Sequence, residues 1–353
     1  MTKKTQHIAL CAMALATILM LLVAVGCGNV RQKNATGAKH GSEKYQKVRL
    51  VLTTSGTATG IDTLVANRIA ETVREASNGA IVIEVYDNDR LAGGNTTQGV
   101  QMIADGSVDI AVYASGTLSK LDRRMAIAAL PWTFADYQTA RRVIDETGGN
   151  FYEKILAQQG LHFLGSTHNG MRQLSNNKHQ VATPGDLTGL KIRILGNADA
   201  RHFFRLYDAV PMPMSRSEIP TALEQGIIDG NDTTIFQLDS FNLLKEQIKF
   251  LTDWHYAYEN YIFVANSKSY DRLDDKTRML ISAKTRAACD WGRDLLEERE
   301  QSIVEKLVAD GVIIKKLNEE ELHKFQTMAK PLTEQLKKFY GQEACDAFQI
   351  PYE

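Results

Sequence analysis

Residues 169–194 read NGMRQLSNNKHQVATPGDLTGLKIRI and place two arginines in different local settings. Arg193 lies in the run 190–195, where apolar residues alternate with polar ones, and this pattern predicts a β-strand. On such a strand Lys191 and Arg193 share one face. Arg172 precedes a polar Ser-Asn-Asn run, so we expect it near a strand-to-loop transition.

A guanidinium fixed on a strand is a rigid, permanently charged group that matches a carboxylate with two parallel hydrogen bonds. Arg193 is therefore a candidate for binding an acidic ligand. The alternative is that Arg193 forms an ion pair with a structural Asp or Glu on a solvated face. Spacing alone does not separate these two interpretations.

Helices and strands alternate on both sides of this stretch. Strands are predicted at 48–52, 80–86, 108–113, 190–195 and 262–266, and helices at 61–77, 97–104, 203–206 and 218–225. The opening βαβαβ order indicates a mainly parallel sheet covered by helices. A further helix is predicted from Lys276 to about Asp310, and its length favours a position across two lobes.

The N-terminus indicates export. Two lysines precede the run 8–26, which has no charged residue, as in a signal peptide. The following Cys27 completes what looks like a bacterial lipoprotein cleavage box, so residues 1–26 would be removed and Cys27 lipidated. An uncleaved anchor and ordinary signal cleavage are the alternatives, and all three place the chain outside the cytoplasmic membrane. The polar segment 27–46 is expected to be a flexible tether.

Composition excludes several classes of function. Without residues 1–26 the chain has about 327 residues, enough for two domains, with 39 basic and 42 acidic side chains and a net charge of −3. The sequence has no basic patch of the kind that nucleic-acid binding requires. The eight histidines lack metal-ligand spacing, so no metal or other cofactor is predicted. Cys289 and Cys345 are expected to form either a disulfide or two buried thiols.

Several motifs match one family in the right order. Residues 183–193, TPGDLTGLKIR, resemble a signature of the solute-binding proteins of tripartite ATP-independent periplasmic (TRAP) transporters. Further resemblances occur at NGMRQ (169–173), TALEQGIIDG (221–230), NDRLAG (88–93), LPWTF (130–134) and YIFVAN (261–266). The resemblance extends from about residue 47 to at least residue 310.

The resemblance implies an α/β, two-lobed periplasmic-binding-protein-like fold of type II-like organisation, with a hinge and a long helix spanning both lobes. Domain I would comprise 47–169 and 259–298, and domain II 170–258 and 299–353. A small-molecule carboxylate would bind between the lobes of a monomer and pass to the membrane permease subunits. The expected location is the periplasm or the cell surface, anchored to the membrane by lipid.

The resemblance also assigns roles to individual residues. It implies that Arg193 binds the carboxylate of the ligand and that Arg172 is a second contact. Many relatives have Gln-Glu-Asn where this chain has Asn231, Asp232 and Thr233, and the Asn of those relatives contacts ligand. We therefore expect Asn231 and Thr233 to lie at the site, although the altered sequence does not identify the acid.

Four further candidates come from less specific positions. Ser115 stands where some relatives have an acidic residue facing the cleft, and Arg216 where an aromatic residue is frequent. Arg216 would either add positive charge for a second acidic group of the ligand or lie on the surface at a helix N-terminus. Ser55 and Thr57, after the first strand, would bond ligand hydroxyls or cap the next element.

Two other functions compete with solute capture for transport. A sensor module that binds the same ligand and signals to a membrane receptor would have the same sequence features. An exported α/β enzyme is disfavoured, because the sequence has no GxSxG nucleophile elbow, phosphate-binding loop or close pair of acids on plausible elements.

Overall fold

The computed structural model describes residues 45–240 and 247–352. The predictions for residues 1–44, which include the signal peptide, the lipidated Cys27 and most of the tether, lie outside the described residues. Within the described ranges, no helix combines the length and the apolar character that crossing a membrane requires.

Ten strands and twelve α-helices are found in the described ranges. The strands are β1 Val48–Thr54, β2 Ile81–Tyr86, β3 Ile110–Ala114, β4 Leu161–Asn176, β5 Lys191–Ile194, β6 Val210–Pro213, β7 Gly230–Thr234, β8 Phe250–Asp253, β9 Tyr258–Asn266 and β10 Ile313–Lys316. The helices are α2 Ile61–Ala76, α3 Thr96–Asp105, α4 Ser115–Leu118, α5 Tyr137–Val143, α6 Gly149–Ala157, α7 Ala198–Leu206, α8 Ile219–Glu224, α9 Ile235–Ser240, α10 Ser267–Tyr270, α11 Asp275–Ala309, α12 Glu319–Tyr340 and α13 Gln342–Ala347. The predicted elements are confirmed, with their ends shifted by a few residues.

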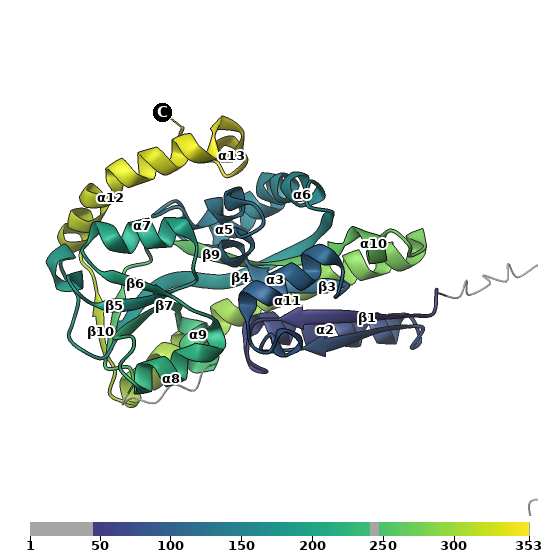
Figure 1. Ribbon diagram of the computed structural model, residues 1–353, viewed down its shortest axis with the longest axis horizontal. Coiled ribbons are helices and arrows are strands. Elements are labelled where there is room, and N and C mark those ends of the chain that lie inside the picture. Colours follow the sequence, from purple (N-terminus) through teal and green to yellow (C-terminus); the bar gives the residue numbers. More distant parts are fainter. Residues whose placement is uncertain (1–44, 241–246, 353) are drawn as a thin grey trace, which may run out of the picture. The chain divides into compact units, whose positions relative to one another are not determined.

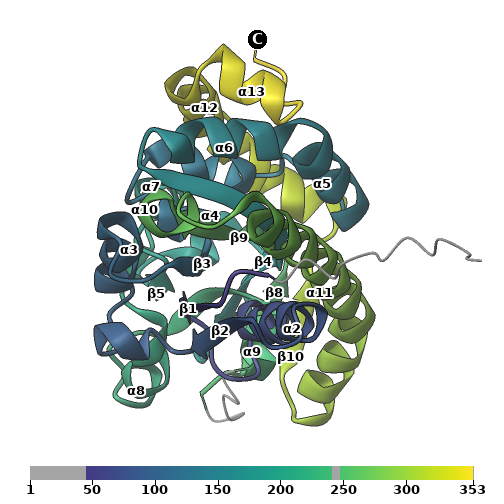
Figure 2. The same ribbon diagram turned by 90° about the vertical axis from the view of Figure 1, so that its right-hand side faces the viewer.

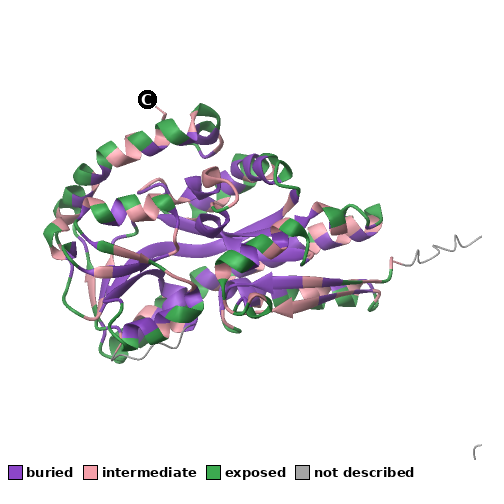
Figure 3. Cartoon of the chain, in the orientation of Figure 1, coloured by how far each residue is buried: buried purple, intermediate pink, exposed green. Residues whose placement is uncertain are grey.

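The strands join in the order β2-β1-β3-β9-β4-β7-β5-β6, with β8 pairing with β4 and β10 pairing with β8. The strand β1 pairs in parallel with β2 and β3, as the βαβαβ pattern predicted. Helices cover both faces of the sheet, with α5, α6 and α12 on one side and α2 and α9 on the other (Figures 1 and 2). The central strands β3, β4, β7 and β9 are mostly buried between these layers, while the edge strands β6 and β10 and the outer helix faces are partly exposed (Figure 3).

The strand β4 belongs to both halves of the sheet. Its residues up to Met171 pair with β9, and from Arg172 to Asn176 it pairs with β7, with β8 also pairing from Leu174 to Asn176. The expectation of a strand-to-loop transition at Arg172 is therefore wrong. The polar residues Gln173 and Ser175 continue the strand because they are buried in it, a tertiary effect that the alternation of apolar residues does not show.

The change of partner strand occurs beside a β-bulge. The register of β4 against β9 shifts between His168 and Gly170. Gly170 has a φ of 127°, where a side chain would be strained, and a Cβ there would lie 3.0 Å from the Cβ of Thr234. Gly170 thus gives the backbone conformational freedom at the point where β4 passes from one half of the sheet to the other.

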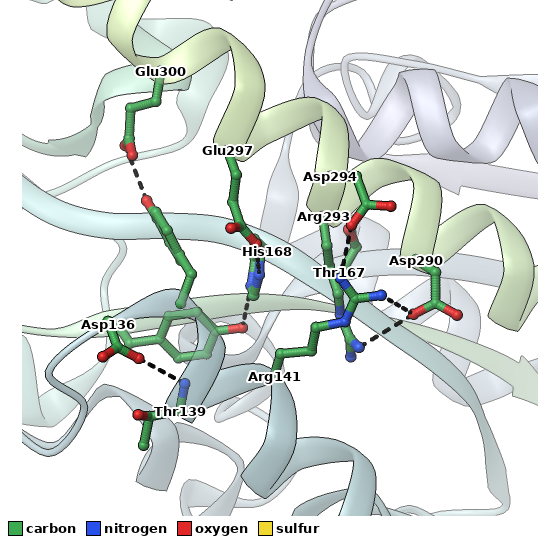
Figure 4. Close-up of polar contacts among 12 residues, drawn as sticks. Asp136, Thr139, Arg141, Thr167, His168, Asp290, Arg293, Asp294, Glu297 and Glu300 are labelled. Atoms are coloured by element: carbon green, nitrogen blue, oxygen red, sulfur yellow. Dashed lines mark hydrogen bonds and ion pairs between the residues drawn. The ribbon is translucent and has the colours of Figure 1, made fainter.

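The long helix α11 runs along this crossing point, as predicted, and packs against α2, β4 and α9. Acidic residues along α11 bond side chains of α5 and β4 (Figure 4). Nε2 of His168 lies 3.2 Å from Glu297, and the hydroxyl of Tyr137 donates to Glu300 at 2.9 Å while accepting from the N–H of Met171. These bonds join the bulged part of β4 to the helix.

The two cysteines of the described chain, Cys289 and Cys345, are buried free thiols. The disulfide alternative is therefore wrong. Burial raises the pKa of the Cys289 thiol, which keeps this side chain a neutral part of the core.

Gly292, in the middle of α11, packs closely against helix α2 and strand β4. A Cβ at this position would lie 2.3 Å from Cγ2 of Val65 and 2.8 Å from Oγ1 of Thr167. We expect Gly292→Ala to lower the free energy of unfolding by about 1–3 kcal/mol through overpacking, although alanine is the better helix former.

Urea denaturation measures this change, and Ser302→Ala at an exposed position of the same helix is the matched control. The control is expected to leave stability unchanged or slightly raised. A more stable Gly292→Ala protein would show that helix propensity outweighs packing at this position.

Candidate functional site

A cavity of about 260 Å³ lies where the two halves of the sheet meet, and both halves contribute to its wall. Ser55 follows β1, residues 95–97 begin α3, Thr117 and Lys120 follow β3, Arg193 to Gly196 end β5, and residues 213–216 with Glu218 follow β6. These segments lie at the carboxyl ends of parallel strands, where open α/β sheets bind ligands. The volume is near the low end of ligand pockets, roughly 300–1,000 Å³, and so suits a small molecule.

Hydrogen bonds hold the two sides of the cavity together at its rim. Ser217 Oγ donates to the carbonyl oxygen of Gly94 at 2.9 Å, and the N–H of Thr96 donates to Ser215 Oγ at 3.3 Å. The segment 95–97 begins α3, and the side chain of Asn95 caps this helix by accepting from the N–H of Gln98.

Arg193 is buried in the cavity wall without an acidic partner among the described residues. Its Nε and Nη2 donate to the carbonyl oxygen of Met214 at 3.2 and 3.1 Å, and its Nη1 is buried without a hydrogen-bond partner. The side chain is only 2% exposed. The alternative of a structural ion pair on a solvated face is therefore wrong.

The electrostatic surroundings of Arg193 favour an added negative charge. Burial, followed by the nearby charges of Arg216 and Arg172, lowers the pKa of Arg193 to about 9. The guanidinium is still protonated at neutral pH, but its charge is poorly compensated. A carboxylate placed at Nη1 would supply both the missing hydrogen bond and the missing charge.

Arg172 is saturated by the protein itself. Its Nε donates to Oδ1 of Asp232 at 2.7 Å, its Nη2 donates to the carbonyl oxygen of Asp232, and its Nη1 is bonded to Glu259. All three side chains are almost fully buried, and none lines the 260 Å³ cavity. This geometry gives Arg172 a structural role. Contact between Arg172 and ligand stays a prediction.

Arg216 lines the cavity and is buried, so the alternative of a surface arginine is wrong. It is only 4% exposed, its Nη2 is bonded to the hydroxyl of Tyr261, and its Nη1 lies 3.7 Å from Oδ2 of Asp62. The tight 3₁₀ turn Arg216–Glu218 turns the side chain inward. Arg216 contributes positive charge to the wall, but Asp62 already compensates much of it.

The remaining predicted residues are divided between the wall and its surroundings. Ser55 lines the cavity, and Asn231 is the cross-strand neighbour of Arg193, fully buried with both amide atoms unpartnered among the described residues. Ser115 is fully buried after β3. Thr233 bonds within its own segment, and Thr57 donates to the carbonyl oxygen of Ser240. Of these five residues only Ser55 lines the cavity.

Sequence reasoning missed Lys120 and Thr117, which line the same cavity. Both follow β3 within a few residues of Ser115, which the sequence did single out. The available signal was their place after the carboxyl end of a parallel strand. The approach of Lys120 to the end of β5 was not visible in the local sequence.

A larger hollow of about 500 Å³ lies between α6, the start of β4 and α11, and most of its charges are matched by one another. Arg293 donates to both carboxylate oxygens of Asp145 at 2.7 and 2.8 Å, and His162 lies between Glu153 and Asp271. Arg286 also lines the hollow, but it is exposed and its Nη1 donates to Ser282 Oγ at 2.7 Å. Nowhere in the described residues do three potential metal ligands come together.

Comparison with known proteins decides the family. Residues 54–339 match the family described as bacterial extracellular solute-binding protein, family 7. The chain belongs to this family. It is a solute-binding protein of the TRAP type and not an enzyme, because the members of the family bind solutes.

Individual relatives support the assignment at modest identity. The 2,3-diketo-L-gulonate-binding periplasmic protein YiaO of Escherichia coli is 27% identical over 70% of this chain and 75% of its own length. The C4-dicarboxylate-binding protein DctB of Bacillus subtilis is 25% identical over 79% of each chain. The sugar acid binding protein DctPAm of Advenella mimigardefordensis, solved with galactonate, shares the fold with a TM-score of 0.82 and 23% identity over 86% of this chain and 99% of its own. The predicted fold class and family are confirmed.

The buried group of Arg172, Asp232 and Glu259 is expected to stabilise the fold rather than to bind ligand. We predict that Asp232→Asn lowers the free energy of unfolding by about 3–5 kcal/mol, because it leaves a buried guanidinium undercompensated. Urea denaturation measures the change. The control is Glu146→Gln in the exposed pair of Arg142 and Glu146, where a much smaller change is expected. Equal effects of the two substitutions would contradict the structural role.

Proposed function

We propose that this chain captures a small organic acid outside the cytoplasmic membrane and delivers it to a TRAP-type membrane permease, with Arg193 binding the carboxylate. The observation that carries the proposal is Arg193, which lines a cavity of suitable size and whose buried Nη1 lacks a partner among the described residues. The relatives named for 2,3-diketo-L-gulonate and C4-dicarboxylates, and the structure containing galactonate, all concern carboxylates. Ser55, which lines the cavity, is the best-placed of the predicted polar residues for the rest of the ligand. Asn231 is the cross-strand neighbour of Arg193 but does not line the cavity, and its contact with ligand stays a proposal.

Binding would close two lobes of a monomer around the acid. We assign residues 47–169 and 259–298 to domain I, and residues 170–258 and 299–353 to domain II. The bulge at Gly170, on the strand that pairs first with β9 and then with β7, supports this boundary. Under this assignment, segments of both lobes line the cavity, so a ligand that contacts both would favour the closed state.

The role of Arg193 predicts a distinctive pair of results. Arg193→Met should weaken binding of the cognate acid by about 2–5 kcal/mol, roughly 30-fold to several-thousand-fold, in isothermal titration calorimetry. In the absence of ligand the same variant should unfold at an equal or higher temperature, because a buried charge without an acidic partner is removed.

The cognate acid is first identified by a thermal-shift screen of uronates, aldonates, C4-dicarboxylates, keto acids and sialic acid, since bound ligand raises the melting temperature. Arg49→Met, which removes an exposed arginine from β1, is the control and should bind as wild type does. Unchanged affinity in Arg193→Met would refute the carboxylate contact.

We also propose that a lipid on Cys27 holds the domain near its permease through the tether 28–46. In cells grown with labelled fatty acid, the wild-type chain should take up label and Cys27→Ser should not. The matched control is Cys11→Ser, which changes the other cysteine of residues 1–44 and should not affect labelling. Labelling of Cys27→Ser would contradict lipidation at this position.

A further inference from the structure

We propose that Lys120 is a specificity-determining residue that binds a second anionic group of the ligand, so that the captured acid carries at least two negative charges. This inference rests on the proposed function, in which Arg193 binds the first carboxylate. It assigns to Lys120 the role that the sequence suggested for Arg216, whose charge is already balanced by Asp62.

Lys120 reaches across the cavity from one half of the sheet to the other. It follows α4, where its N–H donates to the carbonyl oxygen of Thr117 at 3.2 Å. Its Nζ lies 3.8 Å from the position that a Cβ would occupy on Gly196, three residues beyond Arg193. The ammonium group of a lysine from the β3 side is thus placed over the end of β5, beside the Arg193 wall.

The charges around the cavity are unequal. Lys120, Arg193 and Arg216 line it with one acidic residue, Glu218. The carboxylate of Glu218 already accepts a hydrogen bond from the N–H of Ser215 at 2.7 Å. Asp62 compensates the charge of Arg216. The remaining two cations, Lys120 and Arg193, still outnumber Glu218, the one acidic residue of the wall within the described ranges.

The ammonium group of Lys120 forms no hydrogen bond or ion pair with the part of the chain that the structure describes. Lys120 is exposed and lines the cavity. Partial desolvation, followed by the charge of Arg193, lowers the pKa of Lys120, and the nearby carboxylate of Asp89 opposes this effect. Asp89 itself accepts from Tyr113 and Thr96, and burial raises its pKa.

A ligand with one carboxylate would satisfy Arg193 and leave Lys120 without a partner. A ligand with a second anionic group at its other end would satisfy both, because the two cations stand on different walls of one small cavity. The second group need not be buried as deeply as the first, since Lys120 is the more exposed of the two. The chemistry therefore favours a small acid with anionic groups at both ends.

Matched ligand pairs test this inference by calorimetry at fixed ionic strength. D-galactarate has a second carboxylate that D-galactonate lacks, and succinate has a second carboxylate that succinamate lacks. Wild type should bind the dianion of a pair roughly tenfold or more tightly than the monoanion. Lys120→Met should weaken binding of the dianion several-fold more than binding of the monoanion and so abolish this preference, and Lys330→Met, at an exposed position of α12, should behave as wild type.

The outcomes separate the two proposals. A preference for dianions that persists in Lys120→Met, or wild-type binding of monoanions alone, would overturn the role of Lys120 and leave the proposed function standing. Unchanged binding of both members of a pair by Arg193→Met would overturn the proposed function itself. Equal weakening of both members by Lys120→Met would show that Lys120 donates to a group other than a second anion, and would also overturn the inference.

Discussion

A buried guanidinium needs a negative partner, and the centre of this protein is arranged around that requirement. Arg172 has two carboxylates, from Asp232 and Glu259, while Arg216 has Asp62 and the hydroxyl of Tyr261. Arg193 has only the carbonyl oxygen of Met214 among the described residues. Two of the three arginines therefore stabilise the fold, and the third is the one that gains most from an acidic ligand.

The same arrangement links ligand binding to the organisation of the sheet. Arg172 lies on β4 at the residue where its pairing changes from β9 to β7, and its two acids come from those neighbouring strands. The ion group thus joins the two halves of the sheet directly behind the Arg193 wall. Helix α11 adds a second connection through Glu297 and Glu300. A carboxylate at Arg193 would act next to this junction, where a small change in the angle between the halves changes the width of the cavity.

The sequence was informative where function and local pattern coincide. The alternation around Arg193 and the helical periodicity of α2 and α11 predicted those elements, because each depends on neighbours in the sequence. The motif match gave Arg193 the role of the carboxylate-binding arginine of the family. Its position on a strand made it the stronger candidate of the two arginines for that role. These predictions required no knowledge of distant contacts.

The sequence was less informative where distant residues decide the outcome. The polar end of β4 looked like a loop because its bonding partners on β7 are about 60 residues away. Arg216 looked like a surface residue because Tyr261 and Asp62, which draw it inward, come from other elements. Lys120 was not visible as a site residue because its position over Gly196 depends on how the two halves of the sheet meet. In each case tertiary contacts override the local pattern.

The most direct test of the central claim is a crystal structure of the protein with its cognate acid. The account predicts a ligand carboxylate within hydrogen-bonding distance of Nη1 of Arg193, while Arg172 keeps its bonds to Asp232 and Glu259. A carboxylate bound to Arg172 in place of Glu259, with Arg193 making no contact to ligand, would contradict it.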